Sequence, residues 1–121
     1  MDRKLAVELL SEADLPAGFK YSREYLRVVE HGLTDLDPRW IIEGELLRGR
    51  YVDLRARYKD RTLVPFAVRQ DSDDVACWDA AVPNTVFIIH DFTTPARAQR
   101  ASFATFYDWL RQAVEDFIEH G

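Results

Sequence analysis

The chain has only one cysteine, and it has no long apolar run. Because the lone Cys77 cannot form an intramolecular disulfide, the composition fits a reducing compartment. The longest uninterrupted apolar runs, such as residues 86–89, are far shorter than the ~20 residues that a membrane-spanning helix needs. Glu8 interrupts the stretch that would be the apolar region of a signal peptide. We therefore expect a cytoplasmic protein that does not bind membranes.

Apolar content and charge narrow the class of protein further. Hydrophobic residues make up 47% of the 121-residue chain, so we expect a single domain over residues 1–121. The 16 basic and 21 acidic residues give a net charge of −5, which argues against binding to nucleic acid. The charge is uneven, because residues 48–61 hold six basic and two acidic side chains, a net of +4. The rest of the chain carries −9.

Apolar spacing predicts helices in the N-terminal half. A short first helix is expected around Leu5, Leu9 and Leu10. The second helix has clear end signals, with Ser22 placed to cap its first turn and Gly32 placed as a left-handed stop. A third helix is predicted by apolar residues that recur on one helical face. These residues are Leu47, Tyr51, Leu54 and Tyr58.

The pattern then changes to that of a sheet. Residues 40–42 are expected to form a short strand or a buried turn. Residues 63–68, 75–79 and 85–92 are short β-rich runs separated by polar loops, which predicts an antiparallel meander. Since Pro65 cannot donate a ladder hydrogen bond, its strand should lie at an edge or carry a bulge there.

The C-terminal segment carries a long apolar stripe at helical spacing. Its members are Phe103, Phe106, Tyr107, Leu110, Ala113, Val114, Phe117 and Ile118. Such a stripe must cover an apolar surface, and a sheet lined by Phe66 and Ile88 is the natural partner. The expected fold class is α+β: a mainly antiparallel sheet flanked by helices, with a long C-terminal amphipathic helix packed on the sheet.

Few side chains are placed for catalysis. The acidic loop that holds Asp71, Asp73 and Asp74 lacks the glycine and the terminal glutamate of a calcium loop, so a solvated hairpin is preferred to a metal site. His90 is expected to cap a strand or to satisfy a polar group of the core. Cys77 is expected to be a buried structural thiol, because no base lies near it in the sequence. We therefore expect no enzymatic activity, no metal and no cofactor.

Several short motifs between residues 62 and 118 resemble the SUKH superfamily. They are Leu-Val-Pro-Phe-Ala at 63–67, Ala-Cys-Trp-Asp at 76–79, Val-Phe-Ile-Ile at 86–89 and Ser-Phe-Ala-Thr-Phe-Tyr-Asp-Trp-Leu at 102–110. The family often has a Gly-Asp pair in the hairpin after the first motif. Here Asp73 replaces the glycine and Asp74 matches the acid, so the turn is expected to differ in backbone conformation.

The resemblance implies an α+β domain with a non-enzymatic role. The superfamily includes fungal cell-wall assembly regulators and many small bacterial immunity proteins. The bacterial members are typically encoded beside a polymorphic toxin, often a nuclease, and protect the producing cell by binding it. Our first hypothesis is therefore an immunity protein that neutralises a cognate toxin. The acidic balance supports it, because nuclease toxins carry basic clefts and complementary charge speeds association.

The expected contact surface is the acidic hairpin, with Trp78 or Trp109 as an aromatic anchor. The candidate residues are Asp71, Asp73, Asp74, Trp78, Asp79 and Trp109. Helical-wheel arithmetic places Trp109 at the border of the apolar stripe, where partial exposure is expected. Core packing is the favoured alternative for Trp78, and it is also expected for Trp40.

Three other interpretations remain open. The basic segment 48–61 is a solvated helix face that pairs with the acidic loop, or it is a patch that binds an acidic partner or a second copy in a homodimer. A regulatory or scaffold protein of the same superfamily would use that patch without any toxin. The least favoured interpretation is a metal-dependent hydrolase. Its ligands would be Asp71, Asp73, Asp74, His90 and Asp91.

Overall fold

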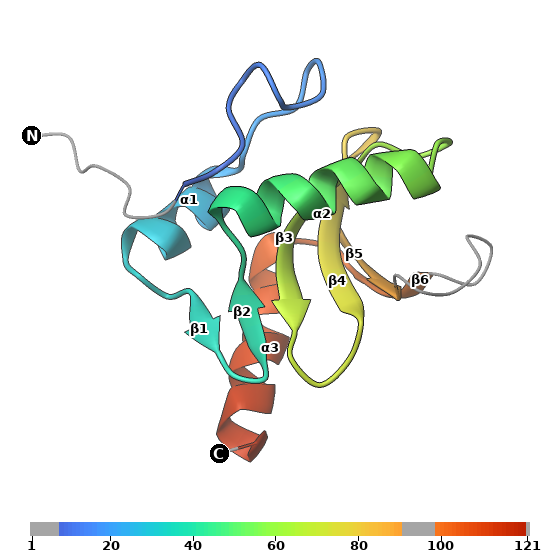
Figure 1. The fold of residues 1–121 in the computed structure, drawn as a ribbon. Coiled ribbons are helices and arrows are strands. Elements are labelled where there is room, and N and C mark those ends of the chain that lie inside the picture. Colours follow the sequence, from blue (N-terminus) through green and yellow to red (C-terminus); the bar gives the residue numbers. More distant parts are fainter. Residues whose placement is uncertain (1–7, 91–98, 121) are drawn as a thin grey trace, which may run out of the picture.

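The computed structural model describes residues 8–90 and 99–120, which form three helices and six strands (Figure 1). The helices are α1 (Arg23–Glu30), α2 (Gly44–Arg57) and α3 (Phe106–His120). The strands are β1 (Asp35–Leu36), β2 (Arg39–Ile41), β3 (Leu63–Arg69), β4 (Asp74–Asp79), β5 (Val82–His90) and β6 (Gln99–Phe103). They form one sheet in sequence order, and neighbouring strands are antiparallel throughout. The predicted α+β fold class is confirmed.

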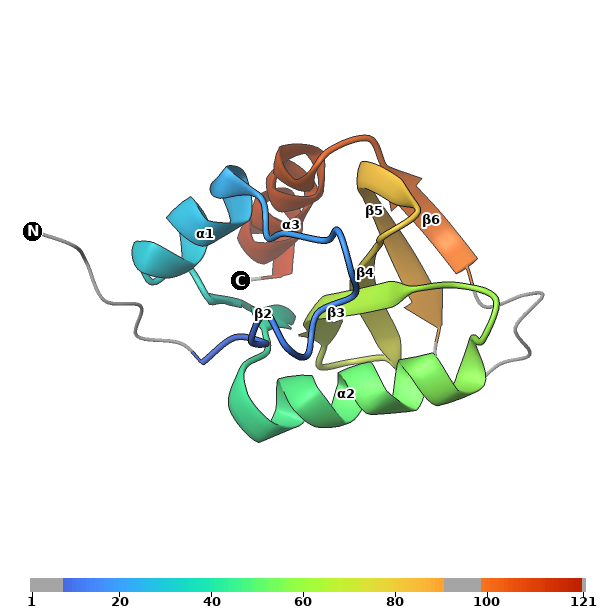
Figure 2. The same cartoon turned by 90° about the horizontal axis from the view of Figure 1, so that it is seen from above.

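Helices cover both faces of the sheet. Helix α2 lies across one face, while α1 and α3 lie together on the other (Figures 1 and 2). The buried side chains of α2 are Leu47 and Leu54, on the stripe that the sequence predicted. Helix α3 buries Phe106, Trp109 and Ala113. The predicted packing of the C-terminal helix on the sheet is therefore confirmed. The prediction that its whole apolar stripe is covered is wrong, because Val114, Phe117 and Ile118 are exposed.

Helix α1 begins and ends where its sequence signals predicted. The Ser22 hydroxyl accepts a hydrogen bond from the backbone N–H of Tyr25 at 3.2 Å. At the other end Gly32 has a φ of +76°, in the left-handed region that favours glycine. The N–H of Leu33 then donates to the carbonyl of Val28 at 3.1 Å, which satisfies an acceptor of the last turn.

Four of the expectations about the elements need correction or fall outside the described residues. Leu9 and Leu10 are not helical, and Leu5 lies outside the described part of the chain. Phe103 ends strand β6 instead of starting the C-terminal helix, because it pairs with a residue of β5. Strand β6 was missed altogether, since its Gln-Arg-Ala-Ser-Phe sequence has little of the apolar, β-branched character of the other runs. Residues 91–92, the end of the third predicted run, are also outside the described ranges.

Strand β3 lies inside the sheet, between β2 and β4, so Pro65 is not at an edge. The register with β4 shifts between Pro65 and Ala67, which confirms the alternative of a bulge. Phe66 occupies the bulge and is completely buried.

Aromatic rings fill the space between the sheet and the layer formed by α1 and α3. Phe66 stacks on Trp78 of β4 with ring centroids 4.3 Å apart, and it meets Trp109 of α3 edge-on at 4.9 Å. Tyr25 of α1 and Phe106 of α3 lie 5.8 and 5.5 Å from the Phe66 ring. These five residues, which we call the aromatic cluster, are at most 4% exposed. They join both helices to the centre of the sheet.

Because two tyrosines are buried, we expect the fold to lose stability at alkaline pH. Burial raises the pKa of Tyr21 to about 12, and it raises the pKa of Tyr25 even more. A pKa that is higher in the folded than in the unfolded state stabilises the fold below the unfolded value of about 10. That contribution is lost as the pH rises from about 10 through the folded-state value.

In a titration of the 5 tyrosines followed by phenolate absorbance, we expect Tyr21 and Tyr25 to ionise only together with unfolding, which circular dichroism detects. Ionisation of all tyrosines near pH ~10 in a chain that stays folded would contradict this expectation.

Candidate functional site

An open groove lies on the sheet face that carries α1 and α3. It has a volume of about 240 Å³. Its apolar lining includes Ala67, Ala76, Ile88, Ala101, Phe103 and Trp109. Ala76, Ile88 and Ala101 are direct neighbours on β4, β5 and β6, so their side chains point to the same face. Two of these three side chains are small, and they leave the hollow that we call the sheet groove.

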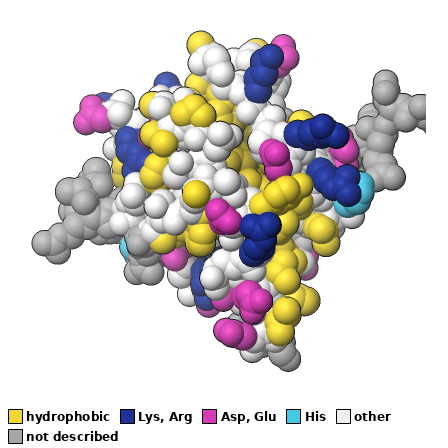
Figure 3. Space-filling view, turned by 180° about the vertical axis from the view of Figure 1, so that it is seen from behind, with side chains coloured by type: hydrophobic (Ala, Val, Ile, Leu, Met, Phe, Trp, Pro, Cys, Tyr) yellow, Lys and Arg dark blue, Asp and Glu magenta, His cyan; other side chains and the backbone are white. Residues whose placement is uncertain are grey.

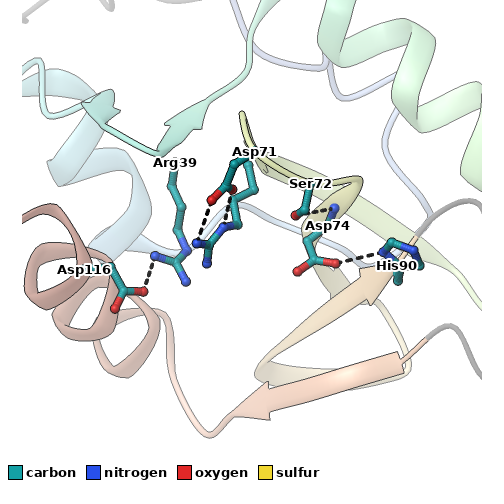
Figure 4. A network of polar contacts seen from close by, with 7 residues as sticks. Arg39, Asp71, Ser72, Asp74, His90 and Asp116 are labelled. Atoms are coloured by element: carbon teal, nitrogen blue, oxygen red, sulfur yellow. Dashed lines mark hydrogen bonds and ion pairs between the residues drawn. The ribbon is translucent and has the colours of Figure 1, made fainter. Parts of the chain in front are cut away.

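Two arginines stand on the rim of the sheet groove (Figure 4). Arg39 of β2 pairs with Asp116 of α3, and Arg69 of β3 donates two hydrogen bonds to Asp71 at 2.5 and 3.0 Å. The hydrogen bond to Asp71 raises the pKa of Arg69. Burial alone would raise the pKa of Asp116, but hydrogen bonds from Arg39 and Gln112 bring it below its usual value. The Arg39–Asp116 pair therefore ties α3 to the sheet beside the groove.

The hairpin between β3 and β4 forms one end of the sheet groove. Asp74 lines the groove, and its Oδ1 lies 3.1 Å from Nδ1 of His90, the last residue of β5 (Figure 4). The backbone N–H of Asp74 donates to the hydroxyl of Ser72 at 3.3 Å. Asp73 is exposed. Among the described non-glycine residues only Asn84 has a positive φ, so Asp73 adopts the turn without left-handed backbone.

Asp79 does not belong to the same patch as the other candidate acids. It lies at the opposite end of β4 from Asp74, about 17 Å away along the strand. It is buried, pairs with Arg61 at 3.2 Å, and accepts a hydrogen bond from the N–H of Ala81 at 3.0 Å. The expected acidic patch is therefore divided, because the strand separates Asp79 from the hairpin.

The two tryptophans that were candidate anchors are not available at the surface. Trp78 is 4% exposed and Trp109 is 2% exposed, because both pack against Phe66 in the aromatic cluster. The expectation that Trp109 is partly exposed is wrong. Trp40, which was expected in the core, is 38% exposed, since only the two-residue β1 lies outside its strand.

A second hollow, of about 440 Å³, lies at the Asp79 end of the sheet. Trp78 and Phe106 of the aromatic cluster line it, together with polar residues that include Lys20 and Glu24. Because these two side chains carry opposite charges, the hollow favours neither an anionic nor a cationic ligand. The sheet groove, which includes one of the hairpin acids, is the stronger candidate.

The expected charge pairing of the basic segment is present in part. Arg61 pairs with Asp79, and its guanidinium carbon lies 4.8 Å from the centroid of the Phe87 ring. Arg48 instead pairs with Glu8 at 2.9 Å, on the N-terminal side of α2. The remaining basic residues of α2 lie on the sheet face opposite to the groove, because α2 covers that face (Figure 2).

Of the metal-ligand candidates, the structure brings Asp74 and His90 into contact. In residues 8–90 and 99–120, no group of three or more His, Cys, Asp or Glu side chains is placed to hold a metal ion. Asp91, a ligand in the hydrolase interpretation, lies outside these residues. Cys77 is completely buried, as the sequence predicted. No helix in the described part of the chain is long and apolar enough to cross a bilayer.

Comparison with known proteins does not assign a family. No protein-family model, curated protein or solved structure matches this chain. The resemblance to the SUKH superfamily therefore rests on the sequence motifs named above. The α+β fold class that it implies is present, but one fold class serves many functions.

The lowered pKa of Asp116 predicts a contribution to stability that acid removes. A carboxyl group whose pKa is lower in the folded state stabilises the fold above its unfolded pKa of about 4, and the contribution is lost as the pH falls through the folded value. Asp116→Asn should therefore reduce the free energy of unfolding at pH 7 by about 1–3 kcal/mol, because Arg39 keeps its charge without a carboxylate beside it.

Urea denaturation at several pH values measures this effect. The stability of Asp116→Asn should decrease less than that of the wild type between pH ~5 and ~3. Asp108→Asn is the matched control, since Asp108 pairs with the 74% exposed Arg111 side chain and should change stability little. The same acid dependence in the wild type and in Asp116→Asn would show that the pair does not stabilise the fold.

Proposed function

We propose that this chain is a non-enzymatic protein-binding domain that neutralises a cognate bacterial toxin by binding it. The observation that carries the proposal is the sheet groove, an apolar hollow with the acidic hairpin at one end. The motifs that resemble the SUKH superfamily supply the class of partner. A nuclease is the toxin type that best fits the net charge of −5.

The groove suits a protruding apolar side chain of a partner. Its alanines leave room, and Ile88 and Phe103 remain partly exposed on its surface. Each CH₂ group that a partner buries there contributes about 0.8 kcal/mol, so one aliphatic side chain provides a useful share of the affinity. The ion pairs on the rim fix Arg39 and Arg69 in place before the partner arrives, which limits the entropy lost on binding.

The acidic hairpin supplies charge selection. Asp71 pairs with Arg69 and Asp74 lies beside His90, and Asp71 and Asp73 are both exposed. A basic surface that approaches this hairpin would therefore meet exposed carboxylates. Complementary charge of this kind increases the association rate and disfavours acidic partners.

Co-expression tests the proposal directly. The protein encoded beside this chain is expressed alone and together with it, and growth of the host is compared. We expect the neighbouring protein to be toxic alone and harmless in the presence of this chain. Equal toxicity in both cultures would overturn the proposal and favour a regulatory or scaffold protein that binds another partner.

The role of the hairpin is tested by reversing one charge. Asp73→Lys should slow association with the toxin roughly tenfold at low salt, and the effect should shrink as salt is added. Asp53→Lys is the matched control, because it makes the same charge change at an exposed position of α2, on the opposite sheet face. Surface plasmon resonance measures both rates, and circular dichroism verifies folding. Equal rates for the two variants would place the contact surface elsewhere.

A further inference from the structure

Large apolar side chains are exposed in the last turns of α3. Val114 is 39% exposed, Phe117 is 46% exposed and Ile118 is 64% exposed. Figure 3 shows hydrophobic side chains along one side of the lower tip of the molecule, with acidic side chains beside them. A cluster of exposed apolar side chains on a protein surface commonly marks an interaction site.

This surface is separate from the sheet groove. Successive residues of a helix are rotated by about 100°, so Val114 and Ile118 each point about 160° away from Asp116 around the helix axis. Asp116 faces Arg39 on the groove rim. The partly exposed Tyr107 and Leu110 continue the same side of α3 toward its N-terminus. We call these five apolar residues of α3, 107, 110, 114, 117 and 118, the outer stripe.

Charged residues of both signs follow the outer stripe. Arg111 and Glu115 lie about 60° and about 100° from Val114 around the helix, on the same flank. The side chain of Arg111 is 74% exposed, and Glu115 is exposed as well. Arg111 therefore comes before Val114, the middle residue of the stripe, and Glu115 comes after it.

We propose that the outer stripe is covered by the outer stripe of a second copy of this chain, in a two-fold dimer with antiparallel α3 helices. A two-fold axis brings the same flank of both helices together. With a rise of 1.5 Å per residue, Arg111 lies about 4.5 Å before Val114 and Glu115 about 1.5 Å after it. A dimer centred on Val114 thus places Arg111 of each copy beside Glu115 of the other, about 3 Å apart along the axis.

This charge pattern favours a second copy over other occupants, because the stripe is complementary to itself. The contact is small: a helix of 15 residues is about 22 Å long and about 10 Å wide. It therefore buries less than the roughly 800 Å² per partner of a standard interface. We expect a weak dimer, with a dissociation constant on the order of 10–100 μM. Since the sheet groove stays open in this dimer, the inference does not depend on the proposed function.

Sedimentation equilibrium over about 5–500 μM of the full chain tests the dimer. The apparent mass should rise from 14.1 kDa toward twice that value. Ile118→Lys should remain a monomer throughout. Val52→Lys is the matched control, because Val52 of α2 is also 64% exposed, and it should dimerise like the wild type. A wild-type monomer at every concentration would overturn the proposal and assign the stripe to another protein or to another segment of the chain.

A charge swap tests the antiparallel geometry. Arg111→Glu and Glu115→Arg should each weaken the dimer at least tenfold, because each places like charges opposite one another. An equimolar mixture should dimerise again, because the heterodimer restores both opposite-charge pairs. Mixing leaves each helix unchanged, so effects on helix stability cannot produce this rescue. If the mixture remains as monomeric as its components, the proposed pairing is wrong.

Discussion

The structure depends on the packing of the Phe66 ring, which lies in the bulge of β3, against four other aromatic side chains. From that position it touches Trp78 in the next strand, Tyr25 of α1, and Phe106 and Trp109 of α3. Aromatic pairs of this geometry are worth about 0.5–1.5 kcal/mol each beyond the area that they bury. The cluster holds the phenol of Tyr25 and the indole of Trp109 in the core, although neither polar group has a hydrogen-bond partner among the described residues. Packing therefore outweighs a desolvation cost of about 1–3 kcal/mol for each group.

The position of α3 explains why a groove remains on the sheet. The aromatic cluster fixes the first half of α3, and the Arg39–Asp116 pair fixes the second half above β2. Beyond this line Ile88 and Ala101 of the sheet remain accessible in the groove. The cluster that stabilises the fold thus also determines the surface that we assign to partner binding. The outer stripe lies on the other flank of the same helix, so the two proposed interfaces do not compete.

Local signals in the sequence predicted local structure well. Ser22 and Gly32 define the ends of α1 because the capping interactions involve neighbours only a few residues away. Pro65 predicted an edge strand or a bulge, because its ring removes one donor, and the bulge is the alternative that the structure shows. The C-terminal stripe predicted a helix, since its apolar positions keep one period over several turns, but it did not predict which face of that helix is buried. These features required no knowledge of the tertiary arrangement.

The candidate site was harder to predict because it depends on contacts between distant residues. Strand β6 is stabilised by its pairing with β5, and its own residues have low β-propensity. The exposure of Trp40 and the burial of Trp109 are set by which elements cover them, so helical periodicity gave the wrong result for Trp109. Asp79 was grouped with the hairpin acids by sequence distance, although an extended strand carries it to the other end of the sheet.

The central claim is that the aromatic cluster carries the fold while the sheet groove is left for binding. Urea denaturation of Phe66→Ala and Ile88→Ala tests it most directly. We predict that Phe66→Ala lowers the free energy of unfolding by about 3–5 kcal/mol, and that Ile88→Ala lowers it by only about 1–2 kcal/mol, because Ile88 is already partly exposed in the groove. Equal losses for the two variants, or a larger loss for Ile88→Ala, would contradict this division between fold and binding surface.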